Sequence, residues 1–72
     1  MALLSQSAEK LVQMGANLYI SAESHYLSQT VERIVQIAAR HGTHVTIEAS
    51  PYLFQSLERF VQIGKGQVTI KI

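Results

Sequence analysis

The chain has 72 residues, a formal net charge of +1 and no cysteine, so it forms one domain at most, without disulfides or a thiolate zinc site. The near-neutral charge gives no electrostatic reason to expect nucleic acid or an anionic membrane as a ligand. No segment approaches the roughly 20 apolar residues of a membrane span, and the N-terminus lacks the basic start and long apolar run of a signal peptide. We therefore expect a cytoplasmic protein.

The same segment is repeated along the sequence, each time followed within a few residues by a short β-type stretch. Five of its twelve positions are identical in all three copies. The copies are LSQSAEKLVQMG (4–15), LSQTVERIVQIA (27–38) and LFQSLERFVQIG (53–64), and the β-type stretches are NLYISA (17–22), HVTIEA (44–49) and QVTIKI (67–72). Such self-similarity is the signature of stacked supersecondary units. It predicts a single domain over residues 1–72, with repeat units at about 3–22, 24–49 and 50–72.

The first unit predicts a helix over residues 4–15 and a strand over residues 17–22. The apolar residues of the helix recur at a spacing that places them on one face. They are Leu4, Ala8, Leu11, Val12 and Gly15, the last of which can end the helix. The strand alternates between an apolar and a polar side. Its apolar side has Leu18, Ile20 and Ala22, and its polar side has Asn17, Tyr19 and Ser21.

The second unit predicts a helix over residues 27–38 and a strand over residues 44–49. We expect Ser24 to cap the helix, His25 to occupy its first position and Gly42 to end it. The apolar helix face has Leu27, Val31, Ile34, Val35 and Ala38. The strand has Val45, Ile47 and Ala49 on its apolar side, with Ile47 at the expected centre of the core, and His44, Thr46 and Glu48 on its polar side.

The third unit predicts a helix over residues 53–64 and a strand over residues 67–72. Ser50 and Pro51 indicate an N-cap followed by the first helical position, where a proline loses no hydrogen bond, and Gly64 and Gly66 mark the helix end. The apolar helix face has Leu53, Leu57, Phe60, Val61 and Gly64. The strand has Val68, Ile70 and Ile72 on its apolar side and Gln67, Thr69 and Lys71 on its polar side.

The order of these elements predicts the architecture. A strand, a helix and a second strand in sequence form a right-handed crossover between parallel strands. Two crossovers in one direction predict a three-stranded parallel sheet in the order 1-2-3, with all helices on one face. Parallel strands covered on both faces have continuous apolar sequences, whereas these strands alternate. We therefore expect a two-layer α/β fold with an open polar sheet face, as in leucine-rich-repeat solenoids, although the signature of those repeats is absent.

The open sheet face is the first candidate binding surface, because it varies most between the copies. Neighbouring strands should place Tyr19, Thr46 and Thr69 in one row and pair Glu48 with Lys71. The alternative interpretation is a solvated face that is kept polar for solubility. The candidate binding residues are Tyr19, Ser21, His44, Thr46, Glu48, Gln67, Thr69 and Lys71.

The outer face of the helices is the second candidate, because its polar residues are retained in every copy. They are Gln6, Gln29 and Gln55, then Gln13, Gln36 and Gln62, and then Glu9, Glu32 and Glu58. One explanation is recent duplication combined with helix propensity. The other is a ladder of amides that contacts a partner or bridges neighbouring helices.

The histidines do not predict a metal site or a catalytic centre. His41 and His44 are separated by the turn between a helix and a strand, and no H-E-x-x-H motif occurs. Glu23, Ser24 and His25 lie at the usual ligand-binding edge of an α/β sheet, but no glycine-rich loop accompanies them. We expect no cofactor and no enzymatic activity, because so small a two-layer fold offers no deep pocket.

Partner recognition is the expected function. The first and last strands are bare edges, and so small a core gains from association. We expect a non-catalytic protein–protein interaction module, by analogy an inhibitor, immunity or adaptor protein, that forms a closed symmetric homodimer and has no membrane partner. The candidate oligomer contacts on the helix flanks are Met14, Ile37, Phe54 and Ile63.

Two alternatives stay open. The first is a nucleic-acid-binding or phage-type regulatory protein that uses the polar sheet face, although Tyr19 is the single ring there against the two or three of sheet-based RNA readers. The second is a fragment-sized enzyme subunit that needs a partner to complete its site.

Overall fold

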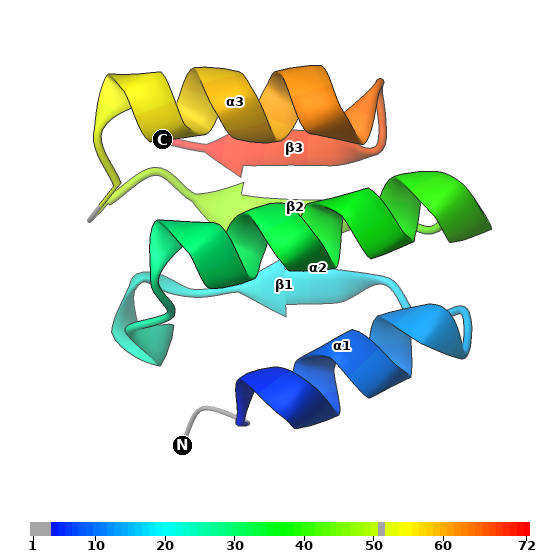
Figure 1. Cartoon of the computed structure of the whole chain (residues 1–72). Helices are drawn as coiled ribbons and strands as arrows, with labels where there is room; N and C mark the ends of the chain where they lie inside the picture. The colour runs from blue at the N-terminus through cyan, green and yellow to red at the C-terminus, as the bar shows by residue number, and fades with distance from the viewer. Residues whose placement is uncertain (1–3, 51) are drawn as a thin grey trace.

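The computed structural model describes residues 4–50 and 52–72. These residues form three α-helices, one short 3-10 helix and three β-strands (Figure 1). In chain order they are α1 (Ser5–Gln13), β1 (Leu18–Ile20), η1 (Ala22–Ser24), α2 (Ser28–His41), β2 (Val45–Glu48), α3 (Phe54–Gly64) and β3 (Val68–Lys71). The alternation of helix and strand predicted from the repeats is therefore confirmed over this part of the chain.

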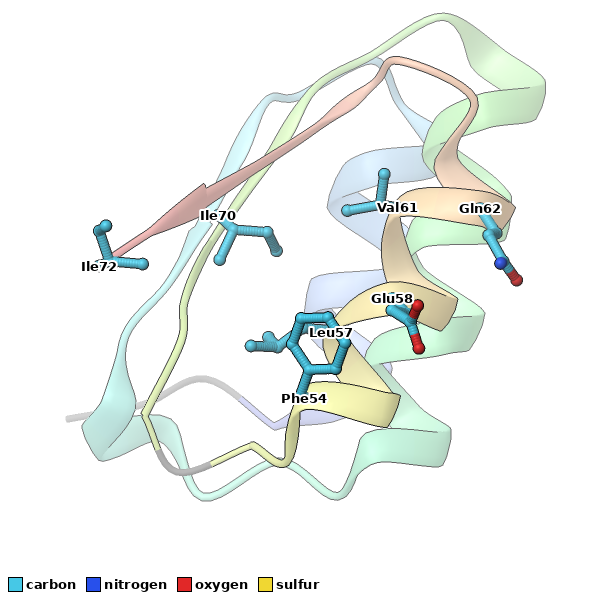
Figure 2. Close-up of a pocket in the computed structure, with 7 residues that line it drawn as sticks. All are labelled: Phe54, Leu57, Glu58, Val61, Gln62, Ile70 and Ile72. Atoms are coloured by element: carbon cyan, nitrogen blue, oxygen red, sulfur yellow. The ribbon is translucent and has the colours of Figure 1, made fainter.

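The described strands form one parallel sheet in the order β1-β2-β3, with β2 in the centre. Val45 of β2, for example, lies between Leu18 of β1 and Val68 of β3. The described helices lie side by side over one face of this sheet and leave the other face uncovered (Figures 1 and 2). The predicted two-layer α/β fold and its strand order are confirmed.

The core lies between the helix layer and the sheet and is centred on the middle unit. Its buried apolar residues are Ala8 and Val12 from α1, Val31, Ile34, Val35 and Ala38 from α2, Phe60 from α3, and Ile20, Val45 and Ile47 from the sheet. Ile47, the expected centre, has no exposed surface. The middle unit contributes most because it has a neighbouring unit on both sides.

The predicted serine caps are wrong. The N-cap residue of α2 is Leu27 and that of α3 is Leu53, and neither makes a side-chain capping hydrogen bond. Ser24 instead ends the 3-10 helix η1, and Ser50 lies in a turn. Both helices therefore begin a few residues later than the serines indicate.

The later start follows from the path of the chain, which must cross from the sheet to the helix layer before a helix can begin. His25, expected at the first helical position, has a φ of 59° in the left-handed region. The hydroxyl of Tyr52 donates a 2.8 Å hydrogen bond to the backbone oxygen of Tyr26, which ties the two crossing segments together. Pro51, the other part of the predicted cap, lies outside the described residues.

Two glycines at the helix ends have different roles. Gly42 has a φ of 74° and ends α2 in the left-handed conformation, as predicted. Gly64 stays within α3, and Lys65 takes the left-handed position with a φ of 50°. A Cβ atom at Gly64 would overlap Cγ2 of Val68 and lie 3.1 Å from Cγ1 of Val35. Gly64 therefore allows α3 to approach both β3 and α2 closely.

Candidate functional site

The polar residues of the strands form the open sheet face. Strand pairing places Thr46 opposite both Tyr19 and Thr69, which confirms the predicted row, and places Glu48 opposite Lys71. A shift of one residue in either pairing would turn the apolar residues of a strand toward this face. Burial of the apolar side of the sheet therefore fixes the register of the strands, and this register determines which polar residues lie opposite one another on the open face.

Glu48 is held by fixed donors on the β1 side of this face. The hydroxyl of Tyr19 donates a 2.6 Å hydrogen bond to its Oε2 atom, and the backbone N–H of Ala22 donates a 2.6 Å hydrogen bond to Oε1. Nζ of Lys71 lies 5.5 Å from the centroid of the Tyr19 ring, within the range of a cation–π contact. In place of the predicted direct pair between Glu48 and Lys71, both residues contact Tyr19.

These contacts favour the charged form of both groups. The hydrogen bond from Tyr19, followed by that from the N–H of Ala22, lowers the pKa of Glu48 below its ordinary value of 4.5. A hydrogen bond to the Tyr19 side chain raises the pKa of Lys71 above its ordinary value of 10.5. A carboxylate with a lowered pKa is a weak general base. The cluster is therefore better suited to holding the sheet face in one arrangement than to accepting a proton.

His44 and Thr69 form a second cluster at the other end of the strands. Nε2 of His44 lies 2.6 Å from Oγ1 of Thr69, and the backbone N–H of His44 donates a 2.9 Å hydrogen bond to Oδ1 of Asn17. Gln67 lies just before β3, and Ser21 lies just after β1, so both are outside the paired strands. The predicted binding residues therefore fall into separate clusters and do not converge on a single site.

A shallow hollow of about 330 Å³ lies at the carboxyl ends of the strands, where α/β sheets commonly bind ligands. It is lined by Ala22, Glu48, Ala49, Ser50, Lys71 and Ile72. A ligand there would meet a carboxylate whose two oxygens already accept hydrogen bonds. The polar groups that this hollow presents to a ligand are therefore already engaged with Tyr19, since Glu48 and Lys71 both contact that residue.

A larger groove, of about 510 Å³, follows the outer flank of the last unit, and we call it the α3–β3 groove (Figure 2). It is lined by Phe54, Leu57, Glu58, Val61, Gln62, Ile70 and Ile72. Phe54 is 73% exposed, and Ile72 is fully exposed. The sequence predicted that Ile72 faces a helix, but the carboxyl end of β3 extends past the cover that α3 provides (Figure 2). Contiguous apolar surface of this kind marks protein–protein contact sites.

The other predicted oligomer contacts divide into exposed and half-buried residues. Met14 is 75% exposed, whereas Ile37 and Ile63 pack against the core at the equivalent position of their units. Ile63 and Ala39 of the preceding helix line the same hollow, so in α3 this position is on the side of the neighbouring unit. Of the four predicted contacts, Met14 and Phe54 remain accessible.

Ion pairs that were not predicted from the sequence connect consecutive helices. Nε of Arg33 in α2 lies 3.1 Å from Oε1 of Glu9 in α1, and Nε of Arg59 in α3 lies 2.8 Å from Oε1 of Glu32 in α2. The signal was a glutamate followed by lysine or arginine at the same two positions of every copy. Exposed pairs contribute only about 0–1 kcal/mol each. In both pairs, the glutamate of one unit binds the arginine of the next unit.

The matched glutamines are exposed, as the sequence predicted. They are Gln6, Gln13, Gln29, Gln36, Gln55 and Gln62. Within residues 4–50 and 52–72 no hydrogen bond joins one glutamine side chain to another, so the helices are bridged by the Arg–Glu pairs and not by an amide ladder. Contact of these glutamines with a partner stays a prediction.

The described ranges contain no group of three or more His, Cys, Asp or Glu residues arranged to hold a metal ion. In the same part of the chain, no helix combines the length and apolar character needed to cross a membrane. Comparison of the chain with models of protein families, with curated proteins and with solved structures finds no match.

Proposed function

We propose that this chain is a small, non-catalytic protein–protein interaction module that acts as a homo-oligomer. The observation that carries the proposal is the α3–β3 groove, where Phe54 and Ile72 expose most of their apolar surface. Covering such surface is favourable by roughly 25 cal/mol per Å². A domain of this size without disulfides gains stability when association extends its core.

The opposite edge of the molecule supports the same conclusion. Leu11 is 37% exposed and Met14 is 75% exposed on α1, which lies at the other end of the helix layer from α3 (Figure 1). Each copy therefore offers two separate apolar surfaces to other copies. An inhibitor, immunity or adaptor role is proposed only by analogy with other small binding proteins.

The nucleic-acid alternative has less support from the open sheet face. The Tyr19 ring, which would have to stack on a base, already contacts Lys71, and its hydroxyl is bound by Glu48. An incoming phosphate would also meet the Glu48 carboxylate. Affinity for nucleic acid should fall steeply with salt, so titration of single-stranded RNA and DNA at two salt concentrations tests this alternative.

Sedimentation equilibrium from micromolar to millimolar concentration tests the proposed function. We expect a mass above that of the 8.0 kDa monomer, rising with concentration together with the melting temperature. Val61→Asp places a charge in the groove and should weaken association about tenfold or more. Gln36→Asp, on the exposed face of α2, is the matched control and should leave association unchanged. An 8.0 kDa species at every concentration would contradict homo-oligomerisation.

A further inference from the structure

The first unit exposes positions that the later units bury. Leu11 of α1 is 37% exposed, whereas its counterparts Ile34 in α2 and Phe60 in α3 have no exposed surface. Met14 is 75% exposed, whereas its counterpart Ile37 packs against the core. Later units bury these positions because a preceding unit lies beside them, and α1 has no preceding unit within the described residues. The flank of α1 is thus shaped to pack against a unit that comes before it.

The last unit exposes an apolar residue on its opposite flank, the one that would face a following unit. Val61 of α3 is 47% exposed, whereas its counterparts Val12 and Val35 have no exposed surface. Val61 lines the α3–β3 groove together with Leu57 and Ile70 (Figure 2). The groove is therefore the surface that a following unit would cover.

The charges at the two ends are also complementary. Within the chain, the glutamate of one unit pairs with the arginine of the next, as in Glu9 with Arg33 and in Glu32 with Arg59. Glu58 is the glutamate of the last unit and lines the groove. Lys10 is the basic residue of the first unit. Among the described residues, neither Glu58 nor Lys10 has an ion-pair partner. Glu58 of one copy and Lys10 of a second copy could therefore form a further pair of the same kind.

The sheet edges allow the same continuation. The strands run parallel in a constant register, with Leu18 opposite Val45 and Val45 opposite Val68. The outer edge of β3 and the outer edge of β1 are both uncovered by another described strand. Repeating the register once more would place Leu18 of a second copy opposite Val68 and continue the parallel sheet.

We propose that a second copy of this chain docks head to tail, with its α1–β1 flank in the α3–β3 groove of the first. Leu11 and Met14 of the second copy then lie beside Val61 of the first, and Lys10 of the second copy pairs with Glu58. The inference rests on the proposed function and specifies its geometry. It differs from the closed symmetric dimer expected from the sequence, because each contact joins two different surfaces. Such contacts leave one free surface at each end, so assembly continues beyond the dimer or closes as a ring.

Charge reversal at the two ends tests this geometry. Glu58→Lys and Lys10→Glu each place like charges across the contact, and each should raise the self-dissociation constant about tenfold. An equimolar mixture of the two variants should associate as the unmodified chain does, because every head-to-tail contact between the variants then joins opposite charges. Gln36→Lys on α2 is the matched control and should have no effect. All three positions are exposed in the folded chain, and a circular dichroism melt verifies that each variant folds.

The outcomes separate the docking geometry from the proposed function. Masses that exceed twice 8.0 kDa, together with rescue in the mixture, support head-to-tail docking. A dimer that does not grow further, with a self-dissociation constant unchanged by both charge reversals, would overturn this geometry. The proposed homo-oligomeric function would remain supported. A monomer at every concentration would overturn both.

Discussion

The middle and last units of this chain have almost the same sequence pattern, but equivalent apolar residues are buried to different extents. Val35 in α2 has no exposed surface, whereas Val61, the same residue type at the same helix position, is 47% exposed in α3. Both residues lie on the apolar stripe of their helix, so the difference comes from the neighbours. Units lie on both sides of α2, and a described unit lies on one side of α3.

Repetition and burial are therefore separate properties of a unit. The repeated pattern determines that each unit forms a helix and a strand with one apolar face. The place of a unit in the array determines whether that face contributes to the core or remains available to a partner. The two outer units consequently carry the surfaces on which the proposed function depends.

The largest expected effect lies in the middle strand. Ile47→Ala should destabilise the fold by about 2–5 kcal/mol, because it removes a fully buried side chain and leaves a cavity. Thr46→Ala, the matched change on the open face, should cost less than about 1 kcal/mol. Urea titration measures both values. Equal losses would mean that the open face is also covered, most simply by another subunit.

The difference in burial between Val35 and Val61 can be tested directly. Val35→Ala should cost about 1.5–3 kcal/mol, since it removes a fully buried side chain. Val61→Ala should cost less than about 1 kcal/mol in dilute solution and more at concentrations where copies associate. Chemical unfolding at two protein concentrations measures the loss in the free energy of unfolding for each variant. An equal cost for both variants in dilute solution would mean that Val61 is as buried in the single chain as Val35.

A smaller effect is expected from pH. Because the folded pKa of Glu48 is lowered below 4.5, its contribution to stability is present above that pH and is lost as the pH falls through the folded pKa. Tyr19→Phe removes the first cause of the shift, so the pKa of Glu48 should rise toward 4.5 and the loss of stability in acid should shrink. An NMR titration of the Glu48 carboxyl measures the change, with Thr69→Ala as a control on the same face. An unchanged titration in Tyr19→Phe would contradict the assigned cause.

The smallest expected effect concerns Ser50, the serine that the sequence predicted as a cap. Because α3 begins at Phe54 with Leu53 as its N-cap, Ser50→Ala should change the free energy of unfolding by no more than about 0.5 kcal/mol. Thermal melts in the same buffer as the valine variants measure it. A cost near the roughly 1 kcal/mol of a lost cap would restore the original interpretation.

The fold could be predicted because its signals are local and repeated. The spacing of Val31, Ile34 and Val35 indicates one face of a helix, and the alternation around Ile47 indicates a strand with one buried side. The repeats also placed the starts of α2 and α3 to within one residue, at 27 and 53. The caps were harder to predict, because Ser24 and Ser50 match the local signature of a cap. The distance that the chain must cross between the layers overrode that signature, and no short segment encodes that distance.

The candidate surfaces could be predicted only in part. Strand alternation placed Tyr19, Glu48 and Lys71 on one face, but it could not show that Tyr19 would contact both charged groups, because that depends on rotamers and on the N–H of Ala22. Phe54 was identified as an exposed contact, but the groove beside it was not.

Local sequence patterns are enough to define the units, their order and the apolar face of each, because helix and strand periodicity are properties of neighbouring residues. Which of these apolar residues are covered depends on how the units pack together, since burial requires contact with a separate element. The fold also places Glu58 and Lys10 at opposite ends without ion-pair partners among the described residues, because the pairs join consecutive units and the described residues include no unit before the first or after the last.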